Sequence, residues 1–265
     1  MNRFKDRVIW ITGASSGIGS ALAIELARVG AVLALSGRDP RSLGNIVREV
    51  EHMGARAKAF PFDISASPNI PALVEEIIGH FGRIDLLINN AGISQRARVE
   101  ESDSTIDRKI MEVNYFGNVA LTRALLPYMK QQGFGHIAVT TSIVGLFGFP
   151  LRSAYAASKH ALHGFYESLR TELTDTPLAI TFIIPGRVKT NISYRALNKN
   201  MQEQGILDQG QARGLPASKA ARVILKGLAR QKKQILVGGR ELYMVYIHKY
   251  FPWLFDHIVR KIKHV

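Results

Sequence analysis

The chain has 265 residues, a formal net charge of +14 and no cysteine, and 46% of its residues are hydrophobic. This length fits one large α/β domain with an ample core. The lack of cysteine excludes disulfides, thiol nucleophiles and cysteine-ligated metals, and the eight scattered histidines predict no metal site. We therefore expect a single domain, residues 1–265, without a metal.

The positive charge is concentrated toward the C-terminus. Residues 219–265 hold eleven Lys and Arg against two acids, so nine of the fourteen net charges lie there. A basic protein can bind nucleic acid, but no RNA- or DNA-binding motif accompanies this charge, and we expect no such partner. The first seven residues show no signal-peptide pattern, so we expect a cytoplasmic protein.

Seven short apolar runs alternate with helix-length segments along the chain. This alternation predicts βαβ units, and runs that are apolar throughout suit parallel strands covered on both faces. We therefore expect a doubly wound, seven-stranded parallel sheet. The runs are residues 8–11, 31–35, 57–62, 84–88, 136–140, 179–184 and 234–237.

A glycine-rich turn follows the first run and reads Thr12-Gly13-Ala14-Ser15-Ser16-Gly17-Ile18-Gly19. An Ala/Leu-rich helical segment over about 17–29 comes next. The N-terminus of such a helix offers unpaired N–H groups and a partial positive charge, which suit a pyrophosphate. The glycine pattern alone is weak evidence and also fits an ordinary tight turn. Its position between a strand and a helix predicts a phosphate site.

The second strand leads into Ser36-Gly37-Arg38-Asp39. At this place in a dinucleotide fold a carboxylate binds the 2′-hydroxyl of the adenosine ribose, whereas Arg accommodates a 2′-phosphate. Arg38 comes before Asp39, and Ser36 replaces the expected acid, so the sequence favours the 2′-phosphate. Two alternatives stay open: Asp39 binds the ribose, or Arg38 is a surface charge paired with Asp39.

Groups with acid–base character follow the fifth strand. Tyr155 and Lys159 are spaced i, i+4 and share one helix face, so we expect the ammonium to favour the phenolate and lower the pKa of Tyr155. Ser142, thirteen residues before Tyr155, can donate to a developing oxyanion. Each residue alone also fits a structural role. Together they predict proton exchange with a carbonyl or alcohol oxygen.

These motifs together resemble the short-chain dehydrogenase/reductase family over nearly the whole chain. They are Thr12-Gly13-x-x-x-Gly17-x-Gly19, Asn89-Asn90-Ala91-Gly92, Ser142, Tyr155-x-x-x-Lys159 and Pro185-Gly186-x-Val188-x-Thr190. The resemblance implies a Rossmann fold, a nicotinamide cofactor and a homodimer or homotetramer. It also implies a catalytic set of Asn114, Ser142, Tyr155 and Lys159, in which Asn114 holds a water that passes protons to Lys159.

The expected cofactor is NADP(H), with NAD(H) as the less favoured choice. The resemblance places Asp63 near the adenine, Lys159 at the nicotinamide ribose and Thr190 near the carboxamide. The full set of expected cofactor-binding residues is Gly13, Ser15, Ser16, Gly17, Ile18, Gly19, Arg38, Asp63, Ile64, Asn90, Ala91, Gly92, Tyr155, Lys159, Pro185, Gly186, Val188 and Thr190.

A polar stretch lies between Pro185-Gly186 and a helix expected at about 216–230. Loops of this length are typically lids or mobile segments. The resemblance makes residues 187–217 a substrate lid, and a surface loop without a role is the alternative. Arg187 stands where the family often has an apolar or small residue, so it is a candidate to face an acidic or phosphorylated substrate.

Residues 240–265 extend beyond the last expected strand and mix aromatic and aliphatic side chains with Lys and Arg. Such a segment suits the surface of an anionic bilayer. Its charges and Pro252 disfavour a membrane-spanning helix. Packing on a partner subunit or over the substrate cleft is the open alternative.

The lid and the extension resemble those of family members that handle lipids, steroids or retinoids. The resemblance therefore implies an enzyme that interconverts a carbonyl and a secondary alcohol on such a hydrophobic substrate. The alternative is a 3-oxoacyl-thioester (acyl carrier protein) reductase, in which Arg96, Arg98 and Arg187 engage acidic groups. A non-catalytic nucleotide sensor is disfavoured, because Tyr155 and Lys159 are both present.

Overall fold

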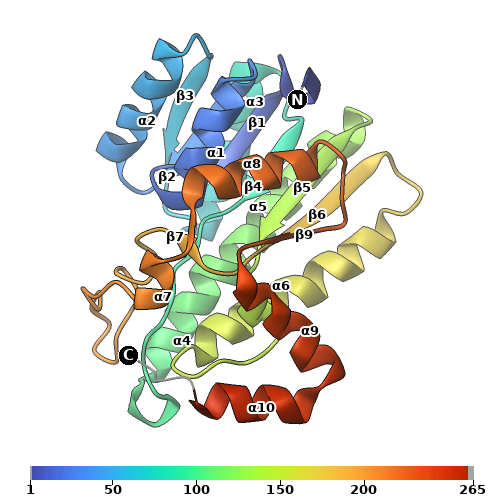
Figure 1. Ribbon diagram of the computed structural model, residues 1–265. Helices are drawn as coiled ribbons and strands as arrows, with labels where there is room; N and C mark the ends of the chain where they lie inside the picture. Colours follow the sequence, from blue (N-terminus) through green and yellow to red (C-terminus); the bar gives the residue numbers. More distant parts are fainter. Residues whose placement is uncertain (1, 262–265) are drawn as a thin grey trace.

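The computed structural model of the protein describes residues 2–261 and has a seven-stranded parallel sheet at its centre (Figure 1). The strand order is β3-β2-β1-β4-β5-β6-β9. The seven apolar runs found in the sequence form these strands, so the predicted doubly wound sheet is confirmed. The strands are β1 (Val8–Thr12), β2 (Val32–Gly37), β3 (Ala57–Pro61), β4 (Leu86–Asn89), β5 (Gly135–Thr140), β6 (Leu178–Pro185) and β9 (Gln234–Val237).

Helices cover both faces of this sheet. One face carries α1 (Gly17–Ala27), α2 (Pro40–His52) and α8 (Ala217–Leu228). The other carries α3 (Ile70–Phe81), α5 (Gly117–Gln131) and α6 (Ser153–Glu172). Strands that are apolar throughout are thereby buried on both sides, as their sequences require.

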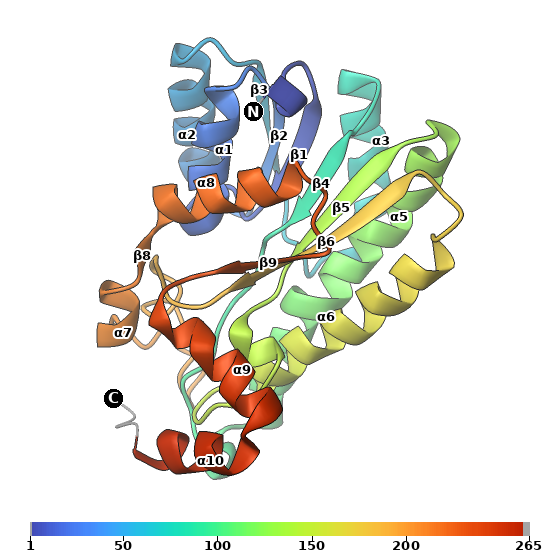
Figure 2. The same cartoon turned by 45° about the vertical axis from the view of Figure 1, so that its right-hand side comes forward.

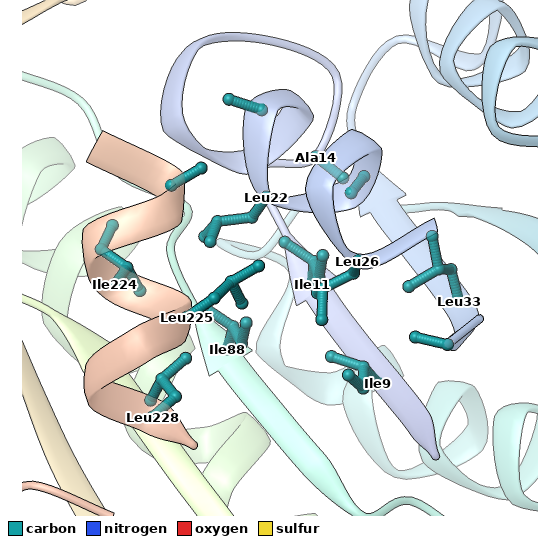
Figure 3. Close-up of a cluster of buried hydrophobic side chains, with 14 of the residues drawn as sticks. Ile9, Ile11, Ala14, Leu22, Leu26, Leu33, Ile88, Ile224, Leu225 and Leu228 are labelled. Atoms are coloured by element: carbon teal, nitrogen blue, oxygen red, sulfur yellow. The ribbon is translucent and has the colours of Figure 1, made fainter. Parts of the chain in front are cut away.

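A buried cluster between α1, α8 and the sheet holds α1, the helix that connects β1 to β2, in place. Figure 3 shows Leu22 and Leu26 of α1 gathered with Leu225 of α8 against Ile9 and Ile11 of β1. All five side chains are fully buried. Full burial of one such side chain contributes roughly 1.5–3 kcal/mol. The cluster therefore holds α1, and the glycine-rich turn before it, firmly on β1.

The end of β2 differs from its sequence interpretation. Ser36 lies inside the strand and is fully buried, and its Oγ accepts a hydrogen bond of 2.9 Å from Trp10 Nε1. A buried indole N–H needs such a partner. Ser36 therefore satisfies a core residue and does not stand in for a ribose-binding acid, while Gly37 is the last residue of the strand.

The strand order reverses between β1 and β4, because the chain first winds outward to β2 and β3 and then returns to the other side of β1. Ligands of α/β sheets bind at the carboxyl ends of the strands at such a reversal. Here Thr12 Oγ1 accepts hydrogen bonds from the backbone N–H groups of Asn90 and Ala91, both of 3.0 Å. Asn90 Nδ2 donates in return to the Thr12 carbonyl at 3.0 Å. The two strand ends are therefore tied together.

Two segments after β6 complete the fold (Figures 1 and 2). The expected lid contains β7 (Val188–Lys189), α7 (Gln209–Ala212) and β8 (Leu215–Pro216), and β7 pairs with β8. The C-terminal extension forms α9 (Tyr243–Tyr250) and α10 (Pro252–Lys261). Ile262 and Lys263, which belong to the expected extension, lie outside the described residues. Within residues 2–261 no helix is long and apolar enough to span a bilayer.

The remaining helical segment before β5 is α4 (Ser104–Met111), which continues into α5 through a π-helical turn, Glu112–Phe116. α4 packs against the first half of α6. A π-helical turn widens the helix locally and is frequent at functional sites. Its position brings Asn114 under the loop that follows β4.

The buried His136 makes the stability of the protein sensitive to acid. Its Nε2 lies 2.8 Å from Thr181 Oγ1, and burial lowers the pKa of His136 from 6.5 to about 4. Between these two values the unfolded chain binds more protons than the folded chain, so the free energy of unfolding rises with pH across this window. Burial of His163, whose pKa is also lowered to about 4, acts in the same direction.

Between pH 4 and 6.5, we expect His136→Gln to remove on the order of 3 kcal/mol of the rise in the free energy of unfolding. Urea unfolding at several pH values measures the slope. His52→Gln, at an exposed position at the end of α2, is the control. A His136→Gln protein with the slope of the wild type would contradict the assignment.

Candidate active site

A cleft of about 1310 Å³ opens at the carboxyl ends of the strands. The loops after the first six strands line it, together with most of the expected lid and the start of the C-terminal extension. All of the expected cofactor-binding residues except Gly19 line this cleft. Of the expected catalytic set, Ser142, Tyr155 and Lys159 line it, and Asn114 lies behind its wall.

The glycine-rich turn has the geometry of a phosphate cradle. Gly13 and Gly17 adopt φ values of +64° and +61°, a left-handed conformation that side chains rarely take. A Cβ on Gly19 would overlap the carbonyl oxygen of Gly13, so only glycine lets α1 pack this closely against the turn. Ser16 makes no side-chain hydrogen bond to the helix, and the first turn of α1 has no acid. The N-terminus of α1 therefore remains open to an anion from the cleft.

After β2, Arg38 and Asp39, the two candidates for binding the adenosine ribose end of the cofactor, have different surroundings. Asp39 caps α2 by accepting hydrogen bonds from Ser42 Oγ and from the Arg41 N–H, which together hold its pKa below the usual value. Asp39 does not line the cleft, whereas Arg38 does. The cap thus engages the carboxylate and leaves the guanidinium of Arg38 at the cleft.

Asp63, after β3, lies within the electrostatic reach of Arg38. Burial opposes ionisation of Asp63, but hydrogen bonds from Ser65 and the charges of Lys109 and Arg38 outweigh this effect and lower its pKa. The Ser65 N–H and Oγ donate to Asp63 Oδ1 at 2.9 and 2.7 Å. The carboxylate is therefore ionised and fixed in orientation at this end of the cleft.

Asn114 sits fully buried in the π-helical turn and braces the loop after β4. Its Oδ1 accepts from the Ile93 N–H at 2.8 Å, and its Nδ2 donates to the Ile93 carbonyl and to Ser158 Oγ, both at 3.0 Å. A Cβ on Gly92 would lie 3.2 Å from Asn114 Oδ1 and 3.4 Å from Lys159 Nζ. The amide thus connects the Gly92 loop to α6.

Ser142, Tyr155 and Lys159 meet at the centre of the cleft. Ser142 Oγ donates to the Pro185 carbonyl and accepts from the Val144 N–H, both at 3.4 Å, and it is close enough to Tyr155 to oppose the rise in the pKa of the phenol. Lys159, one helical turn after Tyr155, has its Nζ 5.8 Å from the centre of the Tyr155 ring and donates to the Thr140 carbonyl at 2.8 Å. The phenol hydroxyl and the Ser142 hydroxyl are therefore placed to address one oxygen atom together.

The expected lowering of the Tyr155 pKa by Lys159 is wrong. Burial raises the pKa of Tyr155, and the hydrogen bond with Ser142 and the charges of Arg96 and Arg152 only partly oppose it. Burial also lowers the pKa of Lys159 from 10.5 to about 8. Desolvation disfavours both charged forms, so the phenol keeps its proton at neutral pH.

The substrate end of the cleft holds several charged residues, which the sequence interpretation found only in part. Arg96 and Arg187 line the cleft as expected. Arg98 does not, because it is exposed and pairs with Glu100 at 3.4 Å. Arg152 and Asp208 were missed, although both line the cleft and Asp208 pairs with Arg96 as well as Arg152.

The C-terminal extension forms part of the cleft wall. Phe255 of α10 is buried against Phe147, with ring centroids 5.0 Å apart, in a cluster that includes Tyr155. Glu241 Oε1 accepts hydrogen bonds from the Arg187 N–H at 2.7 Å and the Gly239 N–H at 3.0 Å. The inner face of the extension thus packs over the cleft, which was one of the open alternatives. No sequence pattern assigned a role to Glu241.

The described part of the chain, residues 2–261, contains no group of three His, Asp or Glu side chains placed to hold a metal ion. The chemistry available in this cleft is therefore that of a phenol, an ammonium, hydroxyls and guanidinium groups. The open N-terminus of α1 and the glycine cradle fit a dinucleotide.

Comparisons with known proteins agree with this cleft. The short chain dehydrogenase family profile matches residues 7–201. Dehydrogenase/reductase SDR family member 7B from Mus musculus is 39% identical over 260 residues, which cover 96% of this chain and 80% of that protein.

Solved structures agree as well. A short chain dehydrogenase/reductase from Burkholderia phymatum in complex with NAD aligns with a TM-score of 0.85 and 27% identity over 96% of both chains. An alcohol dehydrogenase from the archaeon Thermococcus sibiricus, complexed with 5-hydroxy-NADP, aligns with a TM-score of 0.76 and 25% identity over 89% of this chain and 97% of that one. The chain therefore belongs to the short-chain dehydrogenase/reductase family and is a nicotinamide-dependent oxidoreductase.

Proposed function

We propose that the protein interconverts a carbonyl and a secondary alcohol on a hydrophobic substrate, with NADP(H) as cofactor and Tyr155 as general acid and base. The observation that carries this proposal is that Ser142, Tyr155 and Lys159 line one cleft between two halves. One half is the glycine cradle. The other half has an apolar wall beside Tyr155, lined by Val144, Phe147, Phe149, Leu151 and Met244, together with charged residues.

The glycine turn would bind the pyrophosphate of the cofactor, and Arg38 would bind the 2′-phosphate. Lys159 would hydrogen-bond the nicotinamide ribose, and Thr190 would hold the carboxamide. When bound, the nicotinamide would supply or accept the hydride.

The chain's own side chains handle the proton and the substrate oxygen. During reduction negative charge develops on the carbonyl oxygen, and the Tyr155 hydroxyl donates its proton there. Ser142 Oγ donates a hydrogen bond to the same oxygen and holds it beside the phenol. Because burial raises the pKa of Tyr155, the phenol is protonated at neutral pH and ready for this step.

Asn114 acts as a positioning residue in this proposal. Its side chain joins the Ile93 backbone to Ser158, so we assign Asn114 the task of holding the Gly92 loop against α6. We also propose that Asn114 holds the water that passes protons to Lys159, as the family resemblance implies.

We expect Tyr155→Phe to lower kcat/KM by at least about a hundredfold, because the main general acid is lost. The affinity for NADPH should change little, since Phe keeps the packing of the ring. The control is Tyr166→Phe on the same helix, where the buried hydroxyl contacts Thr122 Oγ1 and Asn89 Nδ2. This variant should lose stability but keep turnover. A Tyr155→Phe enzyme as active as Tyr166→Phe would refute the assigned acid.

We expect NADPH to bind more tightly than NADH, and Arg38→Ala to weaken NADPH by about tenfold or more while leaving NADH nearly unchanged. A charge-assisted contact of Arg with a phosphate is stronger than a neutral hydrogen bond. Fluorescence titration of both cofactors measures this. Arg41→Ala, at the exposed second position of α2, is the matched charge control. Equal affinity of the wild type for both cofactors would refute the role assigned to Arg38 and would indicate that Asp39 binds the adenosine ribose.

We further propose that the outer face of α9 and α10 lies on an anionic membrane surface. This outer face consists of Tyr243, Tyr246, Tyr250, Phe251 and Trp253, whose exposed fractions range from 51% to 70%. Lys249, Arg260 and Lys261 are exposed on the same two helices. Aromatic side chains with neighbouring cations suit the interfacial region of a bilayer.

We expect the double variant Phe251→Ser, Trp253→Ser to lose sedimentation with vesicles that contain phosphatidylserine, while NADPH affinity stays unchanged. Salt should weaken binding of the wild type, because surface charge attraction is screened. Val99→Ser removes an equally exposed apolar residue elsewhere and is the control. If the double variant instead dissociates an oligomer and vesicle binding is absent, the outer face is an interface between copies, in keeping with the homo-oligomer that the family resemblance implies.

The alternative activity, a 3-oxoacyl-thioester reductase, would use the same acid and cofactor site. Arg98, one of the three arginines assigned to it, lies outside the cleft. This absence from the cleft favours free ketones over thioesters of an acidic carrier. Turnover of matched acyl thioesters and ketones separates the two activities.

A further inference from the structure

We propose that the cleft contains a recognition site for an acidic group on the substrate, built from Arg96 and Arg152 beside Tyr155. The substrate would then be an amphiphilic ketone or alcohol that carries a carboxylate or a phosphate. This inference rests on the proposed function and deepens it, because it names the substrate class of the same cleft.

The site joins three segments that are far apart in the sequence. Arg96 lies in the loop after β4, Arg152 lies three residues before Tyr155, and Asp208 directly precedes α7 in the expected lid. Arg96 Nε and Nη2 donate to Asp208 Oδ2 at 3.0 and 2.6 Å, and Arg152 Nη2 donates to the same oxygen at 3.0 Å. The three side chains are only 9%, 20% and 14% exposed, in the order Arg96, Arg152 and Asp208.

The charges of this triad do not balance. Two guanidinium groups share one carboxylate oxygen, so one positive charge remains in a largely desolvated place. Buried charges are costly unless they are paired. Of the other acids that line this end of the cleft, Glu241 binds the backbone N–H groups of Arg187 and Gly239, and Glu203 is exposed. An anion from the substrate would supply the missing charge.

The two arginines differ in the donors that they have left. Arg96 Nη1 donates to Ser94 Oγ at 2.9 Å and to the Gln95 carbonyl at 2.5 Å, so its guanidinium is almost fully engaged and held in place. Arg152 Nη1 donates only a 3.3 Å hydrogen bond to the Pro150 carbonyl, and no contact engages its Nε among the described residues. A guanidinium with donors in one plane suits a carboxylate or a phosphate. Arg152 is therefore the group that would meet the anion, and Arg96 supplies fixed charge behind it.

The surroundings explain why the ligand would be amphiphilic. Phe149 lies under the Arg152 guanidinium, whose Cζ is 5.1 Å from the ring centre. Phe147, Leu151 and Met244 line the adjoining wall. Arg195 and Arg213 line the cleft and are exposed to solvent, so their field would attract an anion into the cleft. An acid at Arg152 and an apolar chain along the aromatic wall would satisfy both surfaces.

A second account of the same contacts is that Asp208 only fastens the lid. In that account the loss of Arg152 would affect charged and neutral substrates alike. In the anion-site account it would affect charged substrates selectively. The discriminating quantity is therefore the ratio of kcat/KM for an acid to kcat/KM for its neutral partner, in which general effects on the enzyme cancel.

The first experiment uses a series of linear oxo acids, with the ketone at successive distances from the carboxylate, and their methyl esters. A second arm uses keto-alcohol phosphates and the free alcohols, and so distinguishes the two acidic groups. We expect the wild type to prefer the acidic member of at least one pair, and Arg152→Gln to reduce that ratio by about tenfold or more. Arg98→Gln removes the same charge outside the cleft and should leave the ratio unchanged. Equal use of acid and neutral partner by the wild type, or a parallel loss of both in Arg152→Gln, would overturn the proposal.

The second experiment needs no turnover. Calorimetry measures the binding of a saturated fatty acid and of its methyl ester to wild type, Arg152→Lys and Asp208→Asn. We expect Asp208→Asn to increase the preference for the acid, because the resident carboxylate no longer competes for the arginines, and Arg152→Lys to weaken it. An unchanged preference in Asp208→Asn would overturn the anion site. If the fatty acid binds as expected but no ketone is reduced, the proposed reaction fails and the anion site stands.

Discussion

The hydrogen bonds between the ends of β1 and β4 are the constraint on which the cleft depends. The strand order reverses between β1 and β4, and the backbone pairing of these two strands ends at Ile11 and Ile88. Beyond this pair, the Thr12 and Asn90 side chains continue the connection. Asn90 Nδ2 also donates to the Gly13 carbonyl at 3.4 Å, which ties the glycine turn to the end of β4. A Cβ on Gly92 would lie within 3.4 Å of side-chain atoms of Asn114 and Lys159, so the loop after β4 packs closely on these residues.

Burial shifts the pKa values of Tyr155 and Lys159 more strongly than their proximity to each other does. Desolvation favours the neutral form of Tyr155 and of Lys159 alike. With a pKa lowered only to about 8, Lys159 is still mostly protonated at neutral pH, and the Thr140 carbonyl accepts one of its hydrogen bonds. The cleft therefore holds a protonated phenol beside a single ammonium, which is the state from which a carbonyl oxygen can be protonated.

The sequence predicts those features that depend on local patterns, such as the seven apolar strands, the glycine turn and the i, i+4 spacing of Tyr155 and Lys159. It fails where the outcome depends on a distant partner. The role of Ser36 depends on Trp10 across the sheet. The contact of Arg152 with Asp208 joins residues 56 positions apart. The pKa of Tyr155 depends on how completely its surroundings bury it, among them Phe147 and Phe255, which no spacing rule expresses.

Glu241 shows how the C-terminal extension becomes part of the site. Its carboxylate accepts a hydrogen bond from the backbone N–H of Arg187, which directly follows Pro185-Gly186. A Cβ on Gly186 would lie 2.5 Å from Glu241 Oε1, so this glycine is needed for the contact as well as for the cleft. The same contact fixes where α9 begins, and α9 and α10 bring His248 and Phe255 against Phe147. The aromatic wall beside Tyr155 is thus anchored by one carboxylate bound to backbone N–H groups.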